Sequence, residues 1–134
     1  MIIKLKCRIK PTESPEKIME GIKKIFTDAK LLIDGNHIIG ESTNIDRFKE
    51  LLRSQAILDT GRMVMENGIN GKSTTFKINK QAAYAGMLNF DEDVHGGITV
   101  KIICEEDDDI MDKIKDIAPR TKNGKIIEEN EINE

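Results

Sequence analysis

Aromatic residues and cysteine are scarce in this sequence. Its 134 residues include no tryptophan, one tyrosine and four phenylalanines. A recognition surface built mainly on bases stacked against aromatic rings is therefore disfavoured. The two cysteines, Cys7 and Cys104, are too few for a disulfide framework or a zinc site, and we interpret them as reduced core residues of a cytoplasmic protein. A bridge between them would require their strands to be neighbours.

Long apolar runs are also missing. No run approaches the roughly 18 residues of a membrane span, and the first residues lack the apolar core of a secretion signal, so we expect no membrane contact. With 38% hydrophobic and 34% charged residues, the chain has the composition of a soluble globular protein with one core. The sequence predicts a single α+β domain over residues 1–120, followed by a charged, flexible C-terminal tail over residues 121–134.

The net charge of −3 is unevenly distributed. Residues 1–62 contain 12 basic and 9 acidic side chains, residues 63–101 contain 4 of each, and residues 102–134 contain 5 basic and 11 acidic ones. A basic half combined with an acidic end often marks an interaction surface.

The first predicted strand has a basic outer face. Over residues 2–10, apolar side chains alternate with basic ones, which is typical of a half-buried strand. The outward positions are Lys4, Lys6, Arg8 and Lys10. Four cations in register either form a solvated strand face, in which Lys also blunts an exposed edge, or contact an anionic partner.

Alternation and capping signals predict the remaining elements. They are a helix opened by Ser14-Pro15, a hairpin of strands 30–34 and 36–41, a helix over 44–67, a strand over 73–78, a short helix over 80–85 capped by Asn79, strands at 88–90 and 98–105, and a helix ended by Pro119. The order is βαββαβαββα, and strands that alternate throughout have one covered face and one wet face. We therefore expect a two-layer α+β sandwich with a mostly antiparallel sheet and helices on one face. Its open face would display Lys4, Lys6, Arg8, Lys10, Thr75, Lys77, Thr99 and Lys101.

Three polar residues interrupt the apolar face of the predicted long helix. Gln55, Asp59 and Arg62 stand at positions i, i+4 and i+7, where Leu or Ala would pack on a sheet. A carboxylate and a guanidinium at these positions must be paired or reach water. Either Asp59 and Arg62 form a structural ion pair, with Gln55 bonded to a neighbouring loop, or the three residues line a binding cleft.

Three segments contain glycine or acidic residues but do not match the sequence patterns of known ligand sites. Gly68–Ser73 lacks the glycine spacing and the strand-to-helix order of a phosphate loop. Asp91–His95 does not match the spacing of a standard metal loop, and the acidic run Glu105–Asp109 suits the first turn of a helix. We therefore expect no metal, no cofactor and no catalytic constellation, and hence a protein that is not an enzyme.

Two segments resemble the signatures of a known family. They are Arg53-Ser-Gln55-Ala-Ile-Leu-Asp-Thr-Gly-Arg62 and Asn79-Lys-Gln-Ala-Ala-Tyr84, and they are similar to segments of the archaeal uncharacterised protein family 0201. The resemblance covers about residues 1–124 and departs at Gly61, where the family usually has Ala. Members of this family are described as RNA-binding proteins, with a fold similar to that of the ribosomal protein that binds 5S RNA. The resemblance implies the same fold and an RNA partner for this chain.

The basic face and the resemblance together lead to one functional hypothesis. We expect a non-enzymatic RNA-binding protein that recognises RNA backbone and shape through a basic sheet face. The candidate RNA contacts are Lys4, Lys6, Arg8, Lys10, Arg47, Lys49, Arg53, Lys77, Lys80 and Lys101. One alternative is a self-association module, such as a homodimer in which the basic face meets the acidic end of a second copy. The other is a small-molecule site around Gln55, Asp59 and Arg62.

The two signature segments are also predicted to contact each other. Gln55, Asp59 and Arg62 would hydrogen-bond the turn that contains Asn79 and Gln81, and would so lock the long helix to the sheet. Replacing Asp59 with Ala would then destabilise the fold by a few kcal/mol, because Arg62 would lose its partner.

Overall fold

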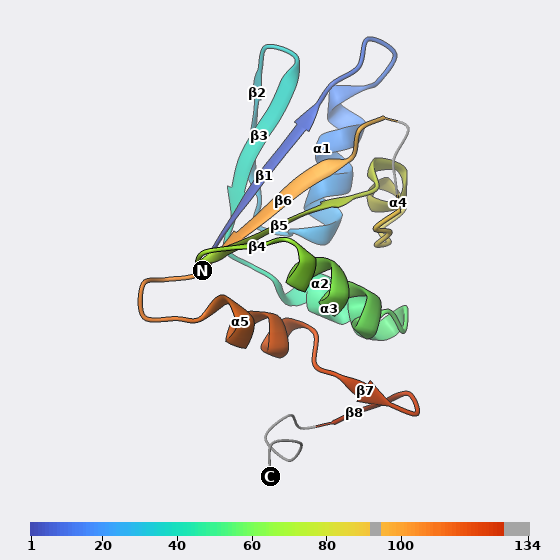
Figure 1. Ribbon diagram of the computed structural model, residues 1–134. Coiled ribbons are helices and arrows are strands. Elements are labelled where there is room, and N and C mark those ends of the chain that lie inside the picture. The colour runs from blue at the N-terminus through green and yellow to red at the C-terminus, as the bar shows by residue number, and fades with distance from the viewer. Residues whose placement is uncertain (92–94, 128–134) are drawn as a thin grey trace.

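Six strands form one antiparallel sheet, and helices cover one of its two faces (Figure 1). The computed structural model describes residues 1–91 and 95–127. The strands of this sheet are β1 (Ile2–Arg8), β2 (Lys30–Asp34), β3 (His37–Ser42), β4 (Ile69–Asn70), β5 (Ser73–Ile78) and β6 (Ile98–Ile103). The helices are α1 (Pro15–Ile25), α2 (Asp46–Ser54), α3 (Leu58–Asn67), α4 (Lys80–Tyr84) and α5 (Ile110–Ile117). The spatial strand order is β2-β3-β1-β6-β5-β4, and the predicted two-layer α+β architecture is confirmed.

Alternation of apolar and polar residues decides which face of the sheet the helices cover. In β1, Ile3, Leu5 and Cys7 are buried, and the residues between them are exposed. The neighbouring strands β5 and β6 bury every second residue in the same way. Full burial of an Ile or Leu side chain is worth roughly 1.5–3 kcal/mol, so a sheet with this pattern binds its helices on the apolar side.

The first helix follows its sequence signals. The Ser14 hydroxyl accepts a hydrogen bond from the Lys17 amide, and Pro15 occupies the first helical position. Ile18, Ile22 and Ile25 form the buried face of α1, as the spacing predicts. The hairpin of β2 and β3 and the cap of α4 by Asn79 are confirmed as well.

The prediction of one long helix over residues 44–67 is wrong. The chain forms two helices, α2 and α3, which are separated by a turn in which Ala56 has φ 56°. A left-handed conformation costs a residue other than glycine roughly 1–2 kcal/mol, and no Gly or Pro marks this turn in the sequence. The turn lets α3 fold back against α2: a Cβ on Gly61 would lie 2.6 Å from Cδ2 of Leu52. Gly61 thus permits a close contact between the two helices.

The prediction of a strand at residues 88–90 is also wrong. Leu88 is buried, but this segment pairs with no strand of the sheet among the described residues. Phe90 instead packs in a cluster of rings, with its centroid 6.4 Å from that of Phe48 and 6.0 Å from that of Phe76. Residues 88–90 therefore form a loop whose apolar side chains pack into the core.

The C-terminal end begins as ordered structure, whereas the sequence predicts a flexible tail from residue 121. Residues 121–126 form a small hairpin of β7 (Thr121–Lys122) and β8 (Lys125–Ile126). Asn123 and Gly124 adopt φ 54° and 78° at its turn, which suits an Asn-Gly hairpin connection. The expectation for residues 128–134 lies outside the described part of the chain.

Candidate nucleic-acid interface

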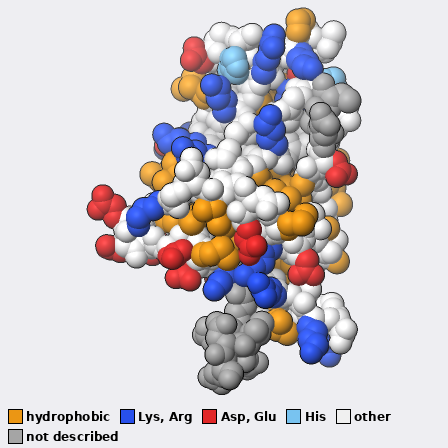
Figure 2. All heavy atoms as spheres, viewed as in Figure 1, with side chains coloured by type: hydrophobic (Ala, Val, Ile, Leu, Met, Phe, Trp, Pro, Cys, Tyr) orange, Lys and Arg blue, Asp and Glu red, His pale blue; other side chains and the backbone are white. Residues whose placement is uncertain are grey.

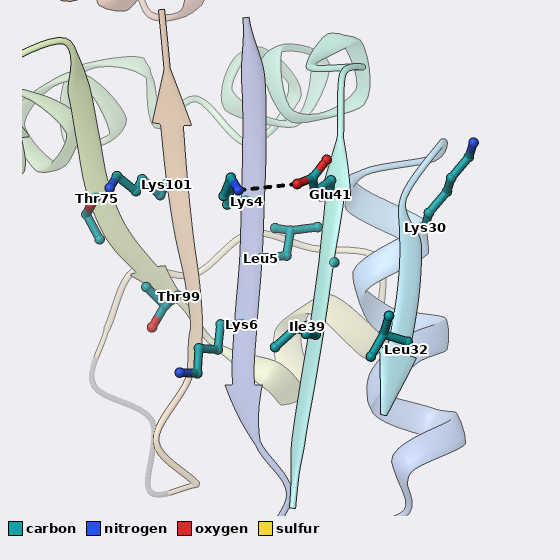
Figure 3. A pocket seen from close by; sticks show the side chains of 11 residues that line it. Lys4, Leu5, Lys6, Lys30, Leu32, Ile39, Glu41, Thr75, Thr99 and Lys101 are labelled. Atoms are coloured by element: carbon teal, nitrogen blue, oxygen red, sulfur yellow. Dashed lines mark ion pairs between the residues drawn. The ribbon is translucent and has the colours of Figure 1, made fainter. Parts of the chain in front are cut away.

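The strand order brings several of the predicted cations together on the open face of the sheet. β1 pairs with β6, and β6 pairs with β5. One row across the three strands contains Lys4, Lys101 and Thr75, and the next row contains Lys6, Thr99 and Lys77. Figure 3 shows the side chains of Lys4, Lys6, Thr99 and Lys101 on this side of the sheet. We call this surface the basic face, and it consists of Lys4, Lys6, Arg8, Thr75, Lys77, Thr99 and Lys101.

A shallow hollow of about 610 Å³ lies on the same side of the sheet (Figure 3). Lys4, Lys6 and Lys101 line one part of it. Leu32 and Ile39 line the other part, where β2 and β3 lie. The hollow therefore combines a cationic part with a part in which apolar side chains lie beside Lys30 and Glu41.

The cations of the basic face are weakly engaged by carboxylates. Lys4 pairs with Glu41 across β1 and β3 at 3.3 Å, and both side chains are more than half exposed. A pair of this kind is worth about 0–1 kcal/mol, so an external anion can replace it. Within the described residues, no carboxylate lies within ion-pair distance of Lys6, Lys77 or Lys101. These three ammonium groups form the part of the face that is electrostatically available.

Three other predicted cations lie in the helical layer and not on the basic face. Arg47 pairs with Glu50, and Lys49 pairs with Asp116 of α5. Arg53 donates to the carbonyl oxygen of Ile117 at 3.2 Å. These three residues join or flank α2 and α5. The ten predicted RNA contacts are therefore divided between the basic face and the helical layer. Lys10 is half-buried in the loop after β1.

Lys80 is a structural residue and lies outside the accessible cations. It is 5% exposed, and its ammonium group pairs with the Glu13 carboxylate at 3.1 Å. It also donates to the carbonyl oxygens of Arg8, at 2.6 Å, and of His95, at 2.8 Å. Lys80 therefore ties the end of β1 to α4 and to the loop that precedes β6. Burial raises the pKa of the nearby Cys7 thiol to about 11, although the Lys80 charge opposes this shift.

The predicted polar cluster is dispersed. The Gln55 amide exchanges two hydrogen bonds with the backbone of Leu88, at 2.9 and 2.8 Å. Asp59 accepts from the Thr121 hydroxyl at 2.8 Å, and Arg62 pairs with Glu66 at 2.8 Å. The predicted bonds of Gln55 and Asp59 to the Asn79–Gln81 turn are therefore wrong. Gln55 does join its helix to a loop, but the loop is the one that follows α4.

The small-molecule alternative has a polar hollow of about 310 Å³ next to α3. Its lining includes Asp59, Arg62, Glu66 and Arg120. Gln55, Asn79 and Gln81 do not line it. Two carboxylates and two guanidinium groups offset each other there, so the lining provides no strong field for a ligand of either sign.

Metal and disulfide chemistry find no support in the described residues. No group of three or more metal-ligating side chains occurs in residues 1–91 and 95–127, and residues 92–94 of the acidic loop lie outside that part. Cys7 and Cys104 are free and buried. Their strands β1 and β6 are neighbours, but the register places Lys6 opposite Thr99 and Ile2 opposite Ile103, so the two thiols lie at opposite ends. No described helix is long and apolar enough to cross a membrane.

Charge on the visible surface is uneven, as the sequence indicates. In the view of Figure 2, most acidic side chains lie over the lower half, and the charged side chains of the upper half are mainly Lys and Arg. The upper half contains the β2–β3 hairpin, and the lower half contains α5 (Figure 1).

Comparisons with known proteins agree on one family. Residues 2–115 match a family model described as RNA binding. The whole chain is 50% identical to a UPF0201 protein of Methanocaldococcus jannaschii and covers 82% of it. A UPF0201 protein of Thermococcus onnurineus is 37% identical over 94% of this chain and 97% of its own length. The fold matches a crystal structure of the UPF0201 protein from Methanococcus jannaschii with a TM-score of 0.91 and 49% identity, over 96% of this chain and 100% of that one.

Proposed function

We propose that this chain, which belongs to the archaeal UPF0201 family, binds RNA through the basic face of its sheet. The observation that carries the proposal is the register of β1, β6 and β5, which aligns Lys4, Lys6, Lys77 and Lys101 on one surface. Phosphate groups are the commonest targets of such aligned cations in nucleic-acid complexes. The description of the matching family as RNA binding supports the same partner.

Recognition would depend on the backbone and shape of the RNA. The four phenylalanines pack against one another in the core, and Tyr84 lies on α4 in the helical layer. The basic face therefore offers no ring on which a base could stack. It offers ammonium groups next to the hydroxyls of Thr75 and Thr99, which suit phosphate and ribose oxygens.

The net charge of −3 is compatible with this proposal because the acidic side chains are concentrated elsewhere. Residues 102–134 carry this acidic excess, and five of their eleven acidic side chains form the run Glu105–Asp109, which follows β6 beyond the end of the strand that carries Lys101. At a Debye length of about 8 Å in physiological salt, exposed charges that lie farther than this from a cation of the basic face are largely screened from it. Local cations then dominate binding.

The test is RNA affinity across a salt series, with ribosomal RNA, transfer RNA and an RNA duplex as probes. A triple variant with Lys6, Lys77 and Lys101 replaced by Gln removes the available ammonium groups. We expect this variant to bind RNA more weakly. Its affinity should also depend less steeply on salt, with the slope of log affinity against log salt smaller in magnitude by about 2–3.

A matched control removes the same charge at positions outside the basic face. Lys17 and Lys23 on α1, together with Lys125 on β8, are exposed and are replaced by Gln in the control variant. It should retain most of the affinity of the natural protein. Equal losses in both variants would mean that binding follows net charge and not the basic face. Absence of RNA binding even at low salt would overturn the proposed function.

A further inference from the structure

The two edges of the sheet are protected to different degrees. β4 forms one edge and is only two residues long. β2 forms the other edge and pairs with β3 at all five of its positions without a bulge. Natural edge strands are commonly blunted by short length, Pro, bulges, central charges or a covering segment. β2 contains no Pro, and its charged residues, Lys30 and Asp34, stand at its two ends.

The centre of β2 is apolar and open to solvent. Leu32 is 56% exposed and Ile33 is 51% exposed, and they lie on opposite faces of the strand. Figure 1 shows β2 at the outer side of the β2–β3 hairpin, with no helix beyond it. The strand thus presents unpaired main-chain groups together with apolar side chains, which is the arrangement that recruits another strand.

We propose that β2 pairs antiparallel with β2 of a second copy of this chain, around a two-fold axis at Leu32. The sequence Lys30-Leu31-Leu32-Ile33-Asp34 is complementary to itself in this register. Lys30 faces the partner's Asp34, and Asp34 faces the partner's Lys30, so both ends carry opposite charges. Leu31 faces the partner's Ile33, and the two copies of Leu32 meet at the axis. This is the self-complementary contact that a two-fold dimer requires.

Charge complementarity favours a second copy over a strand from another protein. A strand with mainly acidic side chains would meet Asp34, and a strand with mainly basic ones would meet Lys30. Opposite charges directly across an antiparallel pair are stabilising, and like charges are destabilising. A second copy of β2 places an opposite charge across from both Lys30 and Asp34.

The pairing would join the two sheets on the same side. Directly opposite residues of an antiparallel pair point to the same face, so the two open faces become continuous. Lys30 and Leu32 line the hollow on the open face, and the hollows of the two copies would therefore adjoin at the axis. This inference depends on the edge of the sheet alone and stands whether or not RNA binds.

The first experiment is sedimentation velocity of the full chain over a concentration series. The interface is a five-residue strand, about 17 Å long, so a concentration-dependent equilibrium is expected. The mass should rise from 15.1 kDa towards twice that value. The variants Lys30→Glu and Asp34→Lys each place like charges at both ends, and each should weaken dimerisation on the order of tenfold.

The double variant Lys30→Glu with Asp34→Lys restores opposite charges and should restore dimerisation. Lys77→Glu on β5 changes the net charge by the same amount as Lys30→Glu and should leave dimerisation unchanged. Thermal melts of every variant establish that each monomer is folded. A protein that stays monomeric throughout the series would overturn the proposal. The proposal would also be overturned if neither single variant weakened dimerisation. The same holds if the double variant dimerised as weakly as the single variants.

A cross-linking pair tests the register. Leu32 and Ile33 are exposed to a similar extent, and the natural thiols of Cys7 and Cys104 are buried. In the proposed register, two copies of residue 32 are direct neighbours, whereas the two copies of residue 33 are offset along the strands and lie on the other face. Mild oxidation of the Leu32→Cys variant should therefore give a covalent dimer, and the Ile33→Cys variant should give little. Equal cross-linking of the two variants would contradict this pairing.

Discussion

The two faces of this one sheet use their polar groups in opposite ways. On the covered side, Lys80, Gln55 and Arg53 are held by internal partners that connect separate elements. On the open side, Lys6 and Lys101 extend from the sheet without a carboxylate partner among the described residues. Both signature segments belong to the covered side. The residues by which the family is recognised therefore build its architecture, and the proposed binding surface consists of residues outside them.

The second signature illustrates this architectural role. Asn79 caps α4 through the Ala82 amide, and Lys80 anchors it to β1. Tyr84 receives a hydrogen bond from Lys24 at its carbonyl oxygen, and the same ammonium group lies 4.6 Å from the ring centroid. A Cβ on Gly21 would lie 2.8 Å from the Tyr84 amide nitrogen, so α1 and α4 are in close backbone contact. These contacts of Asn79, Lys80 and Tyr84 explain why this short helix has a distinctive sequence.

The largest expected difference between the two faces is in the free energy of unfolding after substitution of Lys80 or Lys77. The sequence alone does not distinguish these two lysines. Lys80→Ala leaves the Glu13 carboxylate, whose side chain is 11% exposed, without its ammonium partner. Breaking a buried ion pair costs about 3–5 kcal/mol. Lys77→Ala, on the open face, should change the free energy of unfolding by no more than about 0.5 kcal/mol. Urea unfolding of both variants measures the contrast, and similar values for the two would show that Lys80 does not anchor the fold.

The same contrast shows what could be predicted from the sequence. Inward and outward positions of β1 follow from a local alternation, so the face of Lys4 and Lys6 could be predicted without knowledge of the neighbours. The burial of Lys80 depends on Glu13 and on two carbonyl groups that are distant in the chain. No local pattern distinguishes it from an exposed helical lysine.

The break between α2 and α3 also depends on contacts that no local sequence pattern indicates. Hydrophobic periodicity continues across residues 55–57, and Ala56 is a favourable helix residue. Its left-handed conformation is imposed by the packing of α3 on α2 and by the bonds of Gln55 to Leu88. The polar Gln55 within an apolar helix face therefore correctly predicts a hydrogen bond to a neighbouring segment. It predicts neither that Leu88 is the partner nor that the helix breaks at Ala56.

The next largest effect is expected for Gln55 itself. Gln55→Ala removes both hydrogen bonds to Leu88 and leaves the amide and carbonyl of this buried residue without their partners. An unsatisfied buried polar group costs about 1–3 kcal/mol. The free energy of unfolding should fall by that amount, and hydrogen exchange should accelerate at the Leu88 amide. Unchanged protection at Leu88 would show that the loop is held by other contacts.

A smaller effect is expected at low pH from Asp28, which connects α1 to the start of α2. Hydrogen bonds from the side chains of Ser42 and Thr43, and from the amides of Thr43 and Asn44, lower the pKa of Asp28 from 3.8 to about 2. Because the folded pKa lies below the unfolded one, this stabilisation is complete above pH 3.8 and is lost as the pH falls through about 2. Asp28→Asn should therefore flatten the loss of stability over this acidic range. Thermal melts over the range measure it, with Asp107→Asn at an exposed loop position as the control.

The smallest effect is expected at Asp59, where the sequence and the structure lead to opposite predictions. From the sequence, Asp59→Ala should cost a few kcal/mol, because Arg62 would be left unpaired. In the structure, Asp59 is exposed and accepts one hydrogen bond from Thr121, while the 5% exposed Arg62 pairs with Glu66. One neutral hydrogen-bond donor at the surface is worth about 1 kcal/mol or less.

Asp59→Ala should therefore lower the free energy of unfolding by less than Glu66→Ala does, because the latter leaves a buried guanidinium group without this carboxylate. Equilibrium unfolding of the two variants decides between the predictions. If Asp59→Ala is the more damaging substitution, Arg62 depends on Asp59 after all, and the first signature would be held together by the ion pair that its spacing indicates. If Glu66→Ala is the more damaging one, the buried arginine is stabilised from within α3, and Asp59 serves only to hold the β7–β8 hairpin against that helix.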